Sequence, residues 1–362
     1  MLTKTNEVVL SPSFSISDFT YQHQTIFFDI ETTGLSASVS QIYLIGCGFF
    51  QDGSWQIRQW FAKDIAEEKK ILKEFLKFIR PYFIGITYHG LGFDLPFLKK
   101  RCQFHQLYCP IDRLQMIDIY KKISPYRQIF HLPSLKQKDI EVFLDVPRTD
   151  SCSGKKLISL YQSYLASKED AVLARLLTHN FEDIKNMILI LPILSYEKIF
   201  RGQWIFSDFY IDTYQDLKGE IKEEAILTLK LLTPLPKRLS HSFGEFYFQG
   251  EGDNLKLRIP VYDGELKYFI SDYKNYYYLP GEDTAIHKSV AFYVDKNFRT
   301  QARAATCYSK KNGRFLPQKK QIITPYFKLN YKDKTTYFEC TGKILQNESL
   351  IRKYISHILT CL

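Results

Sequence analysis

Two acidic side chains, Asp29 and Glu31, stand at the end of an apolar run in this chain of 362 residues. The run reads Thr-Ile-Phe-Phe-Asp-Ile-Glu-Thr-Thr-Gly-Leu over residues 25–35. Residues two apart in a β-strand point to the same face, so the two carboxylates are expected side by side. Buried together they repel each other unless a cation neutralises them. Oxygen ligands favour Mg²⁺ or Mn²⁺ over zinc, although an Asp-x-Glu triplet alone is also common at solvated strand ends.

Three more residues have positions suited to the same site. Asp94 follows a second apolar run and a glycine-containing turn, and it begins an amphipathic stretch. Polar groups gather at such strand-to-helix junctions in α/β sheets. His179 and Asp183 lie four apart in a helical pattern and therefore share one face. Each feature alone has an ordinary explanation: a helix N-terminal acid for Asp94, and a surface contact for the His–Asp pair.

Taken together, these segments resemble the DEDD superfamily of 3′-to-5′ exonucleases, which have a ribonuclease H-like fold. Residues 28–35 are similar to the first motif of that family, residues 90–98 to the second and residues 179–183 to the third. Within the superfamily the chain is most similar to the YprB-type branch. This similarity rests on residues between the motifs: Ile117, Asp118, Leu132, Ser134, Leu135, Ser153, Gly154, Tyr161, Tyr164 and Leu165.

The resemblance implies a site for two divalent cations, Mg²⁺ or Mn²⁺. It implies that Asp29 bridges both ions, that Glu31 and Asp183 complete the first, and that Asp94 holds the second. His179 is expected to orient or deprotonate the attacking water, a role that suits imidazole near neutral pH. Three residues in or beside the motifs are expected to contact the substrate: Thr32, His89 and Asn180.

Two positions depart from the family pattern. His179 stands four residues before Asp183. That is the spacing of tyrosine in one DEDD subgroup, whereas another subgroup has histidine five residues before the aspartate. His89 stands where relatives often carry asparagine before glycine.

The apolar pattern also indicates the elements that must position these residues. It predicts strands at 25–30, 41–50, 55–61 and 83–88, and a helix at 64–80. Gln51-Asp-Gly is the expected turn between the second and third strands. We therefore expect an α/β fold, a ribonuclease H-like mixed sheet flanked by helices over residues 21–200, after an extended arm at residues 1–20.

The pattern changes after about residue 200, where we expect a smaller β-rich (α+β) domain at residues 201–362. Strands are predicted at 225–232, 238–249, 255–262 and 265–270. Asp263-Gly264 is the expected hairpin turn between the last two. Helical spacing is found at residues 284–293 and 348–359.

This second region carries most of the net charge of +10. Between residues 296 and 334 basic residues are interleaved with aromatic ones. Lys and Arg neutralise phosphates, while rings stack on unpaired bases at about 1–3 kcal/mol each. Five cations are therefore candidates for substrate binding: Lys310, Lys311, Arg314, Lys319 and Lys320. A solvated basic face over core aromatics is the alternative.

Composition narrows the class of protein further. A hydrophobic content of 45% supports globular cores, and no run approaches the ~20 apolar residues of a membrane span. The polar start lacks a signal-peptide pattern, so a cytoplasmic location is expected. The seven cysteines form no C-x-x-C pair, which argues against a zinc ribbon or a disulfide framework.

The sequence therefore predicts a metal-dependent nuclease, a 3′-to-5′ exonuclease acting on DNA or RNA with a single-stranded end favoured. Two alternatives remain open: a catalytically silent nucleic-acid-binding protein, and a structure-selective endonuclease on the same core. The intact carboxylate set favours an enzyme. Nothing in the motifs distinguishes DNA from RNA or indicates a protein partner.

Overall fold

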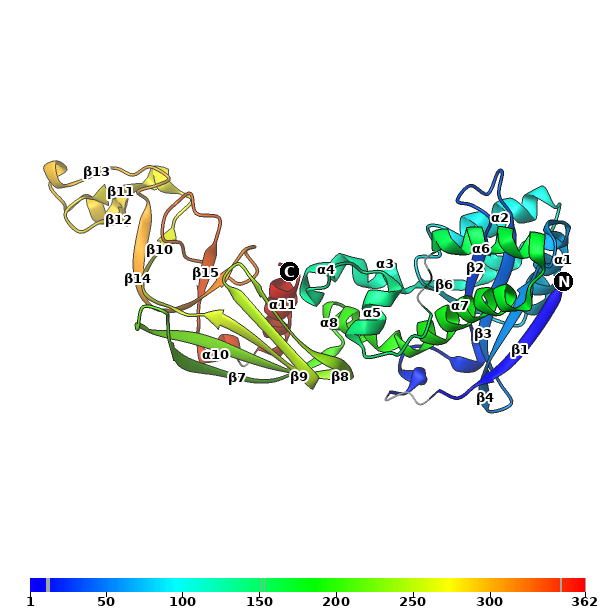
Figure 1. Ribbon diagram of the computed structural model, residues 1–362. Coiled ribbons are helices and arrows are strands. Elements are labelled where there is room, and N and C mark those ends of the chain that lie inside the picture. The colour runs from blue at the N-terminus through cyan, green and yellow to red at the C-terminus, as the bar shows by residue number, and fades with distance from the viewer. Residues whose placement is uncertain (11–13, 151, 153, 346, 362) are drawn as a thin grey trace. The chain divides into compact units, whose positions relative to one another are not determined.

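The computed structural model describes residues 1–362 except 11–13, 151, 153, 346 and 362 (Figure 1). The chain divides into two compact units. The first comprises residues 1–197 with a short return at residues 235–237, and the second comprises residues 198–234 and 238–362. No described helix is long and apolar enough to cross a membrane.

The first unit is built on one mixed six-stranded sheet. Its strands lie in the order β1-β4-β3-β2-β5-β6. The pairs among the first four strands are antiparallel, whereas β2 pairs with β5 and β5 with β6 in parallel. The strand bounds are β1 (Leu2–Val8), β2 (Thr25–Thr32), β3 (Ile42–Gln51), β4 (Ser54–Phe61), β5 (Ile84–Thr87) and β6 (Gln115–Asp118).

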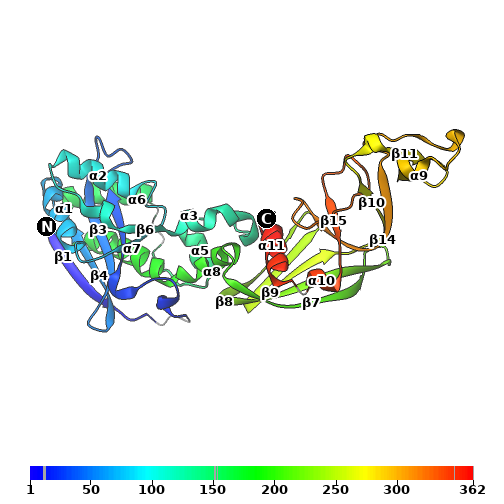
Figure 2. The same cartoon turned by 180° about the vertical axis from the view of Figure 1, so that it is seen from behind.

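Helices cover both faces of this sheet (Figures 1 and 2). Helix α7 packs on one face at Gly48, where Ile184 occupies the space beside the glycine. Helix α1 packs on the other face, where Phe78 contacts Phe49, the next residue along β3. The helix bounds are α1 (Glu68–Phe78), α2 (Asp94–Phe104), α3 (Ile119–Ile123), α4 (Arg127–Phe130), α5 (Gln137–Phe143), α6 (Gly154–Ser167), α7 (Asp170–Leu189) and α8 (Leu194–Phe200). The predicted α/β class, a mixed sheet flanked by helices, is confirmed.

The N-terminal segment, expected as an extended arm at residues 1–20, contains a strand. Residues 2–8 form β1, which pairs along its whole length with β4 and makes an edge of the sheet. The polar sequence did not predict this strand, whose backbone groups find their hydrogen-bond partners in β4. The tight turn between β3 and β4 is found where expected, with positive φ angles of 51° at Asp52 and 83° at Gly53.

The second unit contains three small sheets. Their strand orders are β7-β8-β9, β10-β14-β15 and β12-β11-β13. The strands are β7 (Trp204–Gln215), β8 (Ile221–Phe243), β9 (Phe246–Pro260), β10 (Tyr262–Phe269), β11 (Tyr276–Leu279), β12 (Thr284–His287), β13 (Thr300–Gln301), β14 (Tyr308–Gln318) and β15 (Thr336–Glu339). Short helices accompany them: α9 (Lys288–Ala291), α10 (Gly342–Leu345) and α11 (Glu348–Leu359). The predicted β-rich character and the helix at 348–359 are confirmed.

Three local predictions in this unit were wrong. The strand expected at 238–249 is divided by a turn at Gly244, which separates β8 from β9. Asp263 and Gly264 form no hairpin turn but lie inside β10, paired with Arg314 and Gly313 of β14. Gly264 has a φ of 149°, so the glycine serves an irregular strand position instead of a turn. The helical spacing at 284–293 gives way to β12, because pairing with β11 outweighs local propensity and leaves only the single turn α9.

One glycine of β3 is required by the packing of α7. A Cβ at Gly46 would collide with the side-chain amide of Asn180. We predict that Gly46→Ala lowers the stability of the protein by about 1–3 kcal/mol, the usual cost of overpacking a core. Thermal unfolding followed by circular dichroism measures it. Gly154→Ala is the matched control, because nothing lies within 4 Å of that position; equal melting temperatures for the two variants would contradict the prediction.

Candidate active site

Strand β2 presents the two acidic residues of the first motif. Asp29 and Glu31 are partly exposed at the surface between more deeply buried neighbours. Asp29 pairs in register with Gly46 of β3, on the sheet face covered by α7. Its Oδ2 accepts a hydrogen bond of 3.1 Å from Nδ2 of Asn180. The glycine leaves the space that allows this amide to reach the carboxylate.

Asp94 reaches the same strand from the start of α2. Its side chain is 5% exposed, and Oδ1 accepts a 3.0 Å hydrogen bond from the backbone N–H of Ile30, the residue between the two β2 acids. The loop before α2 is held by buried Asp118, whose two oxygens accept from the backbone N–H groups of His89 and Leu91, each at 3.0 Å.

Helix α7 contributes the third group of residues. His179 and Asp183 lie one turn apart, with Nε2 of the histidine 3.1 Å from Oδ2 of the aspartate. The same Nε2 is 3.7 Å from Oε1 of Glu31 on β2. One ligand atom from each of these three residues lies within 4.8 Å of the other two. The elements β2 and α7 therefore bring together two carboxylates suited to a divalent cation, with an imidazole beside them.

The electrostatics of the cluster show how strongly its charges interact. Burial raises the pKa of Asp29 well above its usual value, and the charges of Asp94, Glu31 and Asp183 raise it further. Burial likewise raises the pKa of Glu31 to about 8 and that of Asp94 to about 7. Such carboxyls ionise together when a divalent cation shares them. The donor set thus fits the hard ions Mg²⁺ and Mn²⁺.

Asp183 is held ionised by cations of the protein itself. Burial alone would raise its pKa, but His179 and Arg148 outweigh this effect and lower it. The guanidinium of Arg148 forms a close ion pair with Oδ1 of Asp183 and a pair with Glu141, Nε to Oε2, at 2.7 Å. Arg148 therefore pairs with a carboxylate for which the family resemblance implies a metal ion.

His179 has a second acidic partner. Its Nδ1 lies 2.5 Å from Oδ2 of Asp150, and both side chains are buried, with exposures of 7% and 8%. Burial lowers the pKa of His179, yet Asp183, Glu31 and Asp150 overcome this and raise it to about 9. The orientation of the imidazole ring is thus set by Asp150 at Nδ1 and by Asp183 at Nε2.

Sequence reasoning missed Glu141, Arg148 and Asp150. They belong to α5 or lie in the irregular segment after it, where no periodicity predicts which side chains point inward. The Arg148-Thr-Asp150 spacing carried no family signal. Ser153, part of the sequence similarity, lies outside the described residues.

Two of the expected substrate contacts have structural partners instead. Asn180 is fully buried: its Oδ1 accepts from Nε2 of Gln59 at 3.0 Å, while its amide nitrogen holds Asp29. Asn180 therefore positions the carboxylate of Asp29, and its expected contact with substrate stays a prediction. Thr32 is 7% exposed and donates to the carbonyl of Gly34 at 2.8 Å. His89, by contrast, is exposed.

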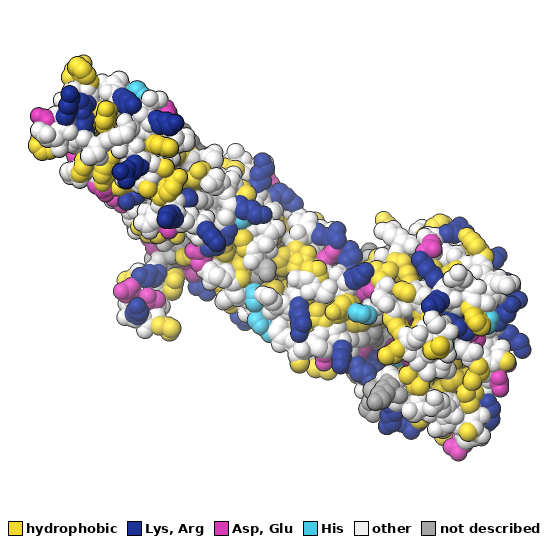
Figure 3. All heavy atoms as spheres, turned by 90° about the horizontal axis from the view of Figure 1, so that it is seen from above, with side chains coloured by type: hydrophobic (Ala, Val, Ile, Leu, Met, Phe, Trp, Pro, Cys, Tyr) yellow, Lys and Arg dark blue, Asp and Glu magenta, His cyan; other side chains and the backbone are white. Residues whose placement is uncertain are grey.

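The basic residues expected to bind substrate lie in the second unit, mostly in ion pairs. Lys311 contacts Glu339 at 2.6 Å, Arg314 contacts Glu223 at 2.9 Å, and Lys310 contacts Asp283 at 2.6 Å. Lys319 pairs closely with Glu245, and Lys320 is exposed. On the face drawn in Figure 3, Lys and Arg side chains are dispersed and do not form one continuous band.

The interleaved aromatic residues divide into two groups. Tyr308, Phe315 and Phe327 are buried, whereas Phe298 and Tyr331 are exposed. Tyr308, Phe315 and Phe327 are therefore core residues, as the alternative of a solvated basic face over core aromatics expected.

The raised pKa values make the stability of the metal-free protein depend on pH. A carboxyl whose folded-state pKa is raised binds its proton more tightly folded than unfolded, so stability falls as pH rises through the folded-state value. We predict that, in chelator, the melting temperature falls as pH rises from about 4.5, the ordinary pKa of a glutamate, to about 8, the raised pKa of Glu31. Glu31→Gln should reduce this fall by roughly 2–4 °C, the shift for a change near 1 kcal/mol. Glu74→Gln, at an exposed position of α1, is the control. Parallel curves for the Glu31 variant and the wild type would contradict the prediction.

Comparison with known proteins extends the description of the first unit. Residues 26–195 match the family model of the RNase_H superfamily. No curated protein matches the chain. Similar solved structures include the family B DNA polymerase from the hyperthermophilic archaeon Pyrobaculum calidifontis, with 12% identity, a TM-score of 0.38, and coverage of 69% of this chain and 35% of the polymerase.

A product-bound exonuclease I is similar at 9% identity and a TM-score of 0.30, with 59% of each chain covered. The zinc-bound E. coli ExoI–ssDNA complex is similar at 9% identity and a TM-score of 0.29, with coverage of 58% of this chain and 55% of that one. The chain thus spans between about a third and three fifths of the length of these structures. From the family match and the mixed sheet with its flanking helices, residues 26–195 form a ribonuclease H-like domain.

Proposed function

We propose that the protein is a metal-dependent nuclease, a 3′-to-5′ exonuclease of the DEDD type and of its YprB-like branch. The observation that carries the proposal is the meeting of Asp29, Glu31, Asp94 and the His179/Asp183 pair, contributed by β2, α2 and α7. A carboxylate set of this kind suits hydrolysis of a phosphodiester with the help of divalent cations. A nucleic-acid strand is accordingly the proposed substrate, and the motifs give no preference between DNA and RNA.

Two divalent cations held by Asp29, Glu31, Asp94 and Asp183 would supply the positive charge that phosphodiester hydrolysis needs at the attacking and leaving oxygens. The chain's own part is to keep these carboxylates in place. Asn180 fixes Asp29 through its amide, and the N–H of Ile30 fixes Asp94. Each support comes from a group that is itself buried, so the oxygens are oriented before substrate arrives.

His179 is the proposed base. Its Nδ1 faces Asp150, which selects the tautomer with the proton on that nitrogen and leaves Nε2 as the acceptor for a proton of water. The charges of Asp183 and Glu31 raise the pKa of the ring and favour its protonated form. Cations bound to those carboxylates would offset these charges and favour the neutral imidazole that a base requires.

Arg148 is proposed to exchange with cations at Asp183. It pairs with this carboxylate, and it has alternative acidic partners in Glu141 at 2.7 Å and Asp150 at 3.5 Å. Release of Asp183 thus leaves the guanidinium paired, which lowers the cost of the exchange.

The second unit is proposed to hold the strand outside the active site. The ion pairs of Lys311, Arg314 and Lys319 lie at the surface, with the cations 40–51% exposed. Surface pairs of this kind are worth about 0–1 kcal/mol, so phosphates compete with the carboxylates for these cations.

We predict that the protein cleaves nucleic acid in Mg²⁺ or Mn²⁺ and is inert in excess chelator. Asp29→Asn should lower the turnover number by orders of magnitude, because it removes a metal-ligand charge. The assay uses 3′- and 5′-labelled single- and double-stranded DNA and RNA, and the product ladder separates stepwise removal from the 3′ end from internal cleavage. Full activity in chelator contradicts the proposal, and binding without cleavage supports a silent nucleic-acid-binding protein.

We also predict separate effects for the two members of the His179–Asp150 pair. His179→Ala should reduce turnover by about 10²–10⁴-fold, the usual contribution of general acid–base catalysis. Asp150→Asn should reduce it less and should change the pH–rate profile, since an amide no longer favours the proton on Nδ1. His23→Ala, which removes an exposed histidine, is the control. Unchanged turnover in both site variants would remove this pair from the mechanism.

A further inference from the structure

A cavity of about 600 Å³ lies in the first unit beside the second motif. Two aromatic rings, His89 and Tyr120, meet edge to face in its wall with their centroids 4.5 Å apart. The loop carrying His89 is held by Asp118, and Gly92 leaves room for the ring, since a Cβ at that glycine would lie only 3.2 Å from Nε2 of the histidine. The wall is therefore fixed by the fold.

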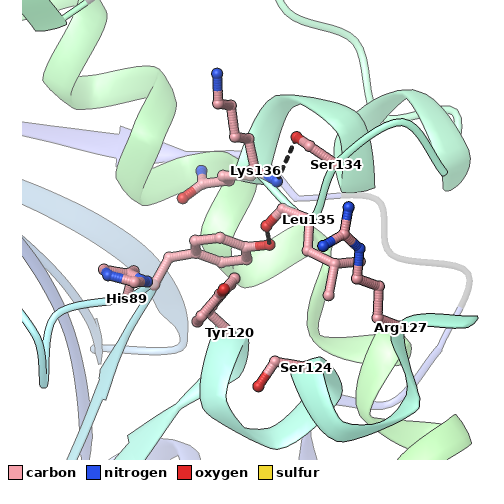
Figure 4. A pocket seen from close by; sticks show the side chains of 9 residues that line it. His89, Tyr120, Ser124, Arg127, Ser134, Leu135 and Lys136 are labelled. Atoms are coloured by element: carbon pink, nitrogen blue, oxygen red, sulfur yellow. Dashed lines mark hydrogen bonds between the residues drawn. The ribbon is translucent and has the colours of Figure 1, made fainter.

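Two cations complete the cavity. Arg127 and Lys136 both line it, and both are exposed. Neither forms an ion pair with a carboxylate among the residues that the structure describes. In this respect they differ from Lys310, Lys311 and Arg314 of the second unit, which do. Figure 4 shows His89, Tyr120 and Arg127 around the same space.

The cavity adjoins the carboxylate cluster. The loop whose His89 lines the cavity leads directly to Asp94, the first residue of α2. On another wall, Nε2 of Gln137 donates to the main-chain carbonyl of Asp183 at 2.9 Å. The cavity and the cluster therefore share the loop before α2 and the contact between Gln137 and the backbone of Asp183.

We propose that this cavity binds one nucleotide unit of the substrate strand, with its base against His89 and Tyr120 and its phosphate at Arg127 and Lys136. The inference rests on the proposed function and extends it by naming a subsite. The two chemistries present, flat rings and cations without acidic partners, match a base and a phosphate. Inorganic phosphate uses only the cations, and an apolar ligand uses only the rings.

The first test measures affinity for a fluorescent single-stranded oligonucleotide with the full chain in chelator, where the strand stays intact. Tyr120→Leu removes the ring while keeping an apolar side chain, and should weaken binding by about 5- to 100-fold. Tyr120→Phe keeps the ring and should bind within about twofold of wild type. Equal affinities for the Leu and Phe variants overturn the proposal.

The second test concerns the cations. Arg127→Gln and Lys136→Gln should each weaken binding and lower the slope of log affinity against log salt by about 0.7, the value for one phosphate contact on a single strand. Arg80→Gln is the matched control, since Arg80 is an exposed arginine elsewhere in the unit. A nucleoside 5′-monophosphate should compete at concentrations where inorganic phosphate does not. Competition by phosphate alone, or equal losses in Arg80→Gln, overturns the assignment.

A third measurement locates the base directly. An oligonucleotide with 5-iodouracil at successive positions is photocrosslinked to the wild-type chain, and the modified peptide is identified by mass spectrometry. Adducts on His89 or Tyr120 at one register support the proposal, and adducts confined to other segments overturn it. A chain that crosslinks there but does not cleave in Mg²⁺ or Mn²⁺ refutes the nuclease proposal alone. A chain that cleaves while the cavity variants bind like wild type refutes the cavity proposal alone.

Discussion

The candidate active site has to hold several largely buried carboxylates close together, and like charges at short range repel strongly. The structure meets this constraint with a separate donor for each acid. Asn180 supports Asp29, and the backbone of β2 supports Asp94. Asp183 is neutralised by a histidine of its own helix and by Arg148 from a distant loop. The convergence of β2, α2 and α7 follows from this need, because no single element can supply all these donors.

This arrangement explains how much of the site could be predicted from the sequence. Asp29 and Glu31 belong to a strand of period two, and His179 and Asp183 to a helix, so regular geometry alone places each pair on one face. Arg148 and Asp150 lie in an irregular segment, where nothing in the spacing shows that their side chains turn toward α7. Asn180 was found by motif, but its contact with Asp29 could not be predicted, because it depends on Gly46 and Gln59 of other strands.

The fold shows the same division between local and tertiary information. The apolar runs predicted β2, β3, β4 and β5, since a buried strand needs a continuous apolar sequence. They did not predict β1, whose polar residues are ordered by pairing with β4. Charge was equally hard to interpret: the basic stretch of the second unit is prominent in the sequence, yet Lys311 and Arg314 already face acids, whereas Arg127 and Lys136 in the described part of the first unit do not.

Asp118 connects the loop before α2 with the start of α3. This carboxylate is 2% exposed and accepts from the N–H groups of His89 and Leu91 on one side and from that of Lys121, at 3.2 Å, on the other. It ties the loop that ends at Asp94 to the start of α3, which carries Tyr120. The separation between carboxylate cluster and cavity is therefore set by covalent geometry and one buried side chain. Under the proposed function, a strand engaged at both places would be held in one register, set by this scaffold and not by the chemical step.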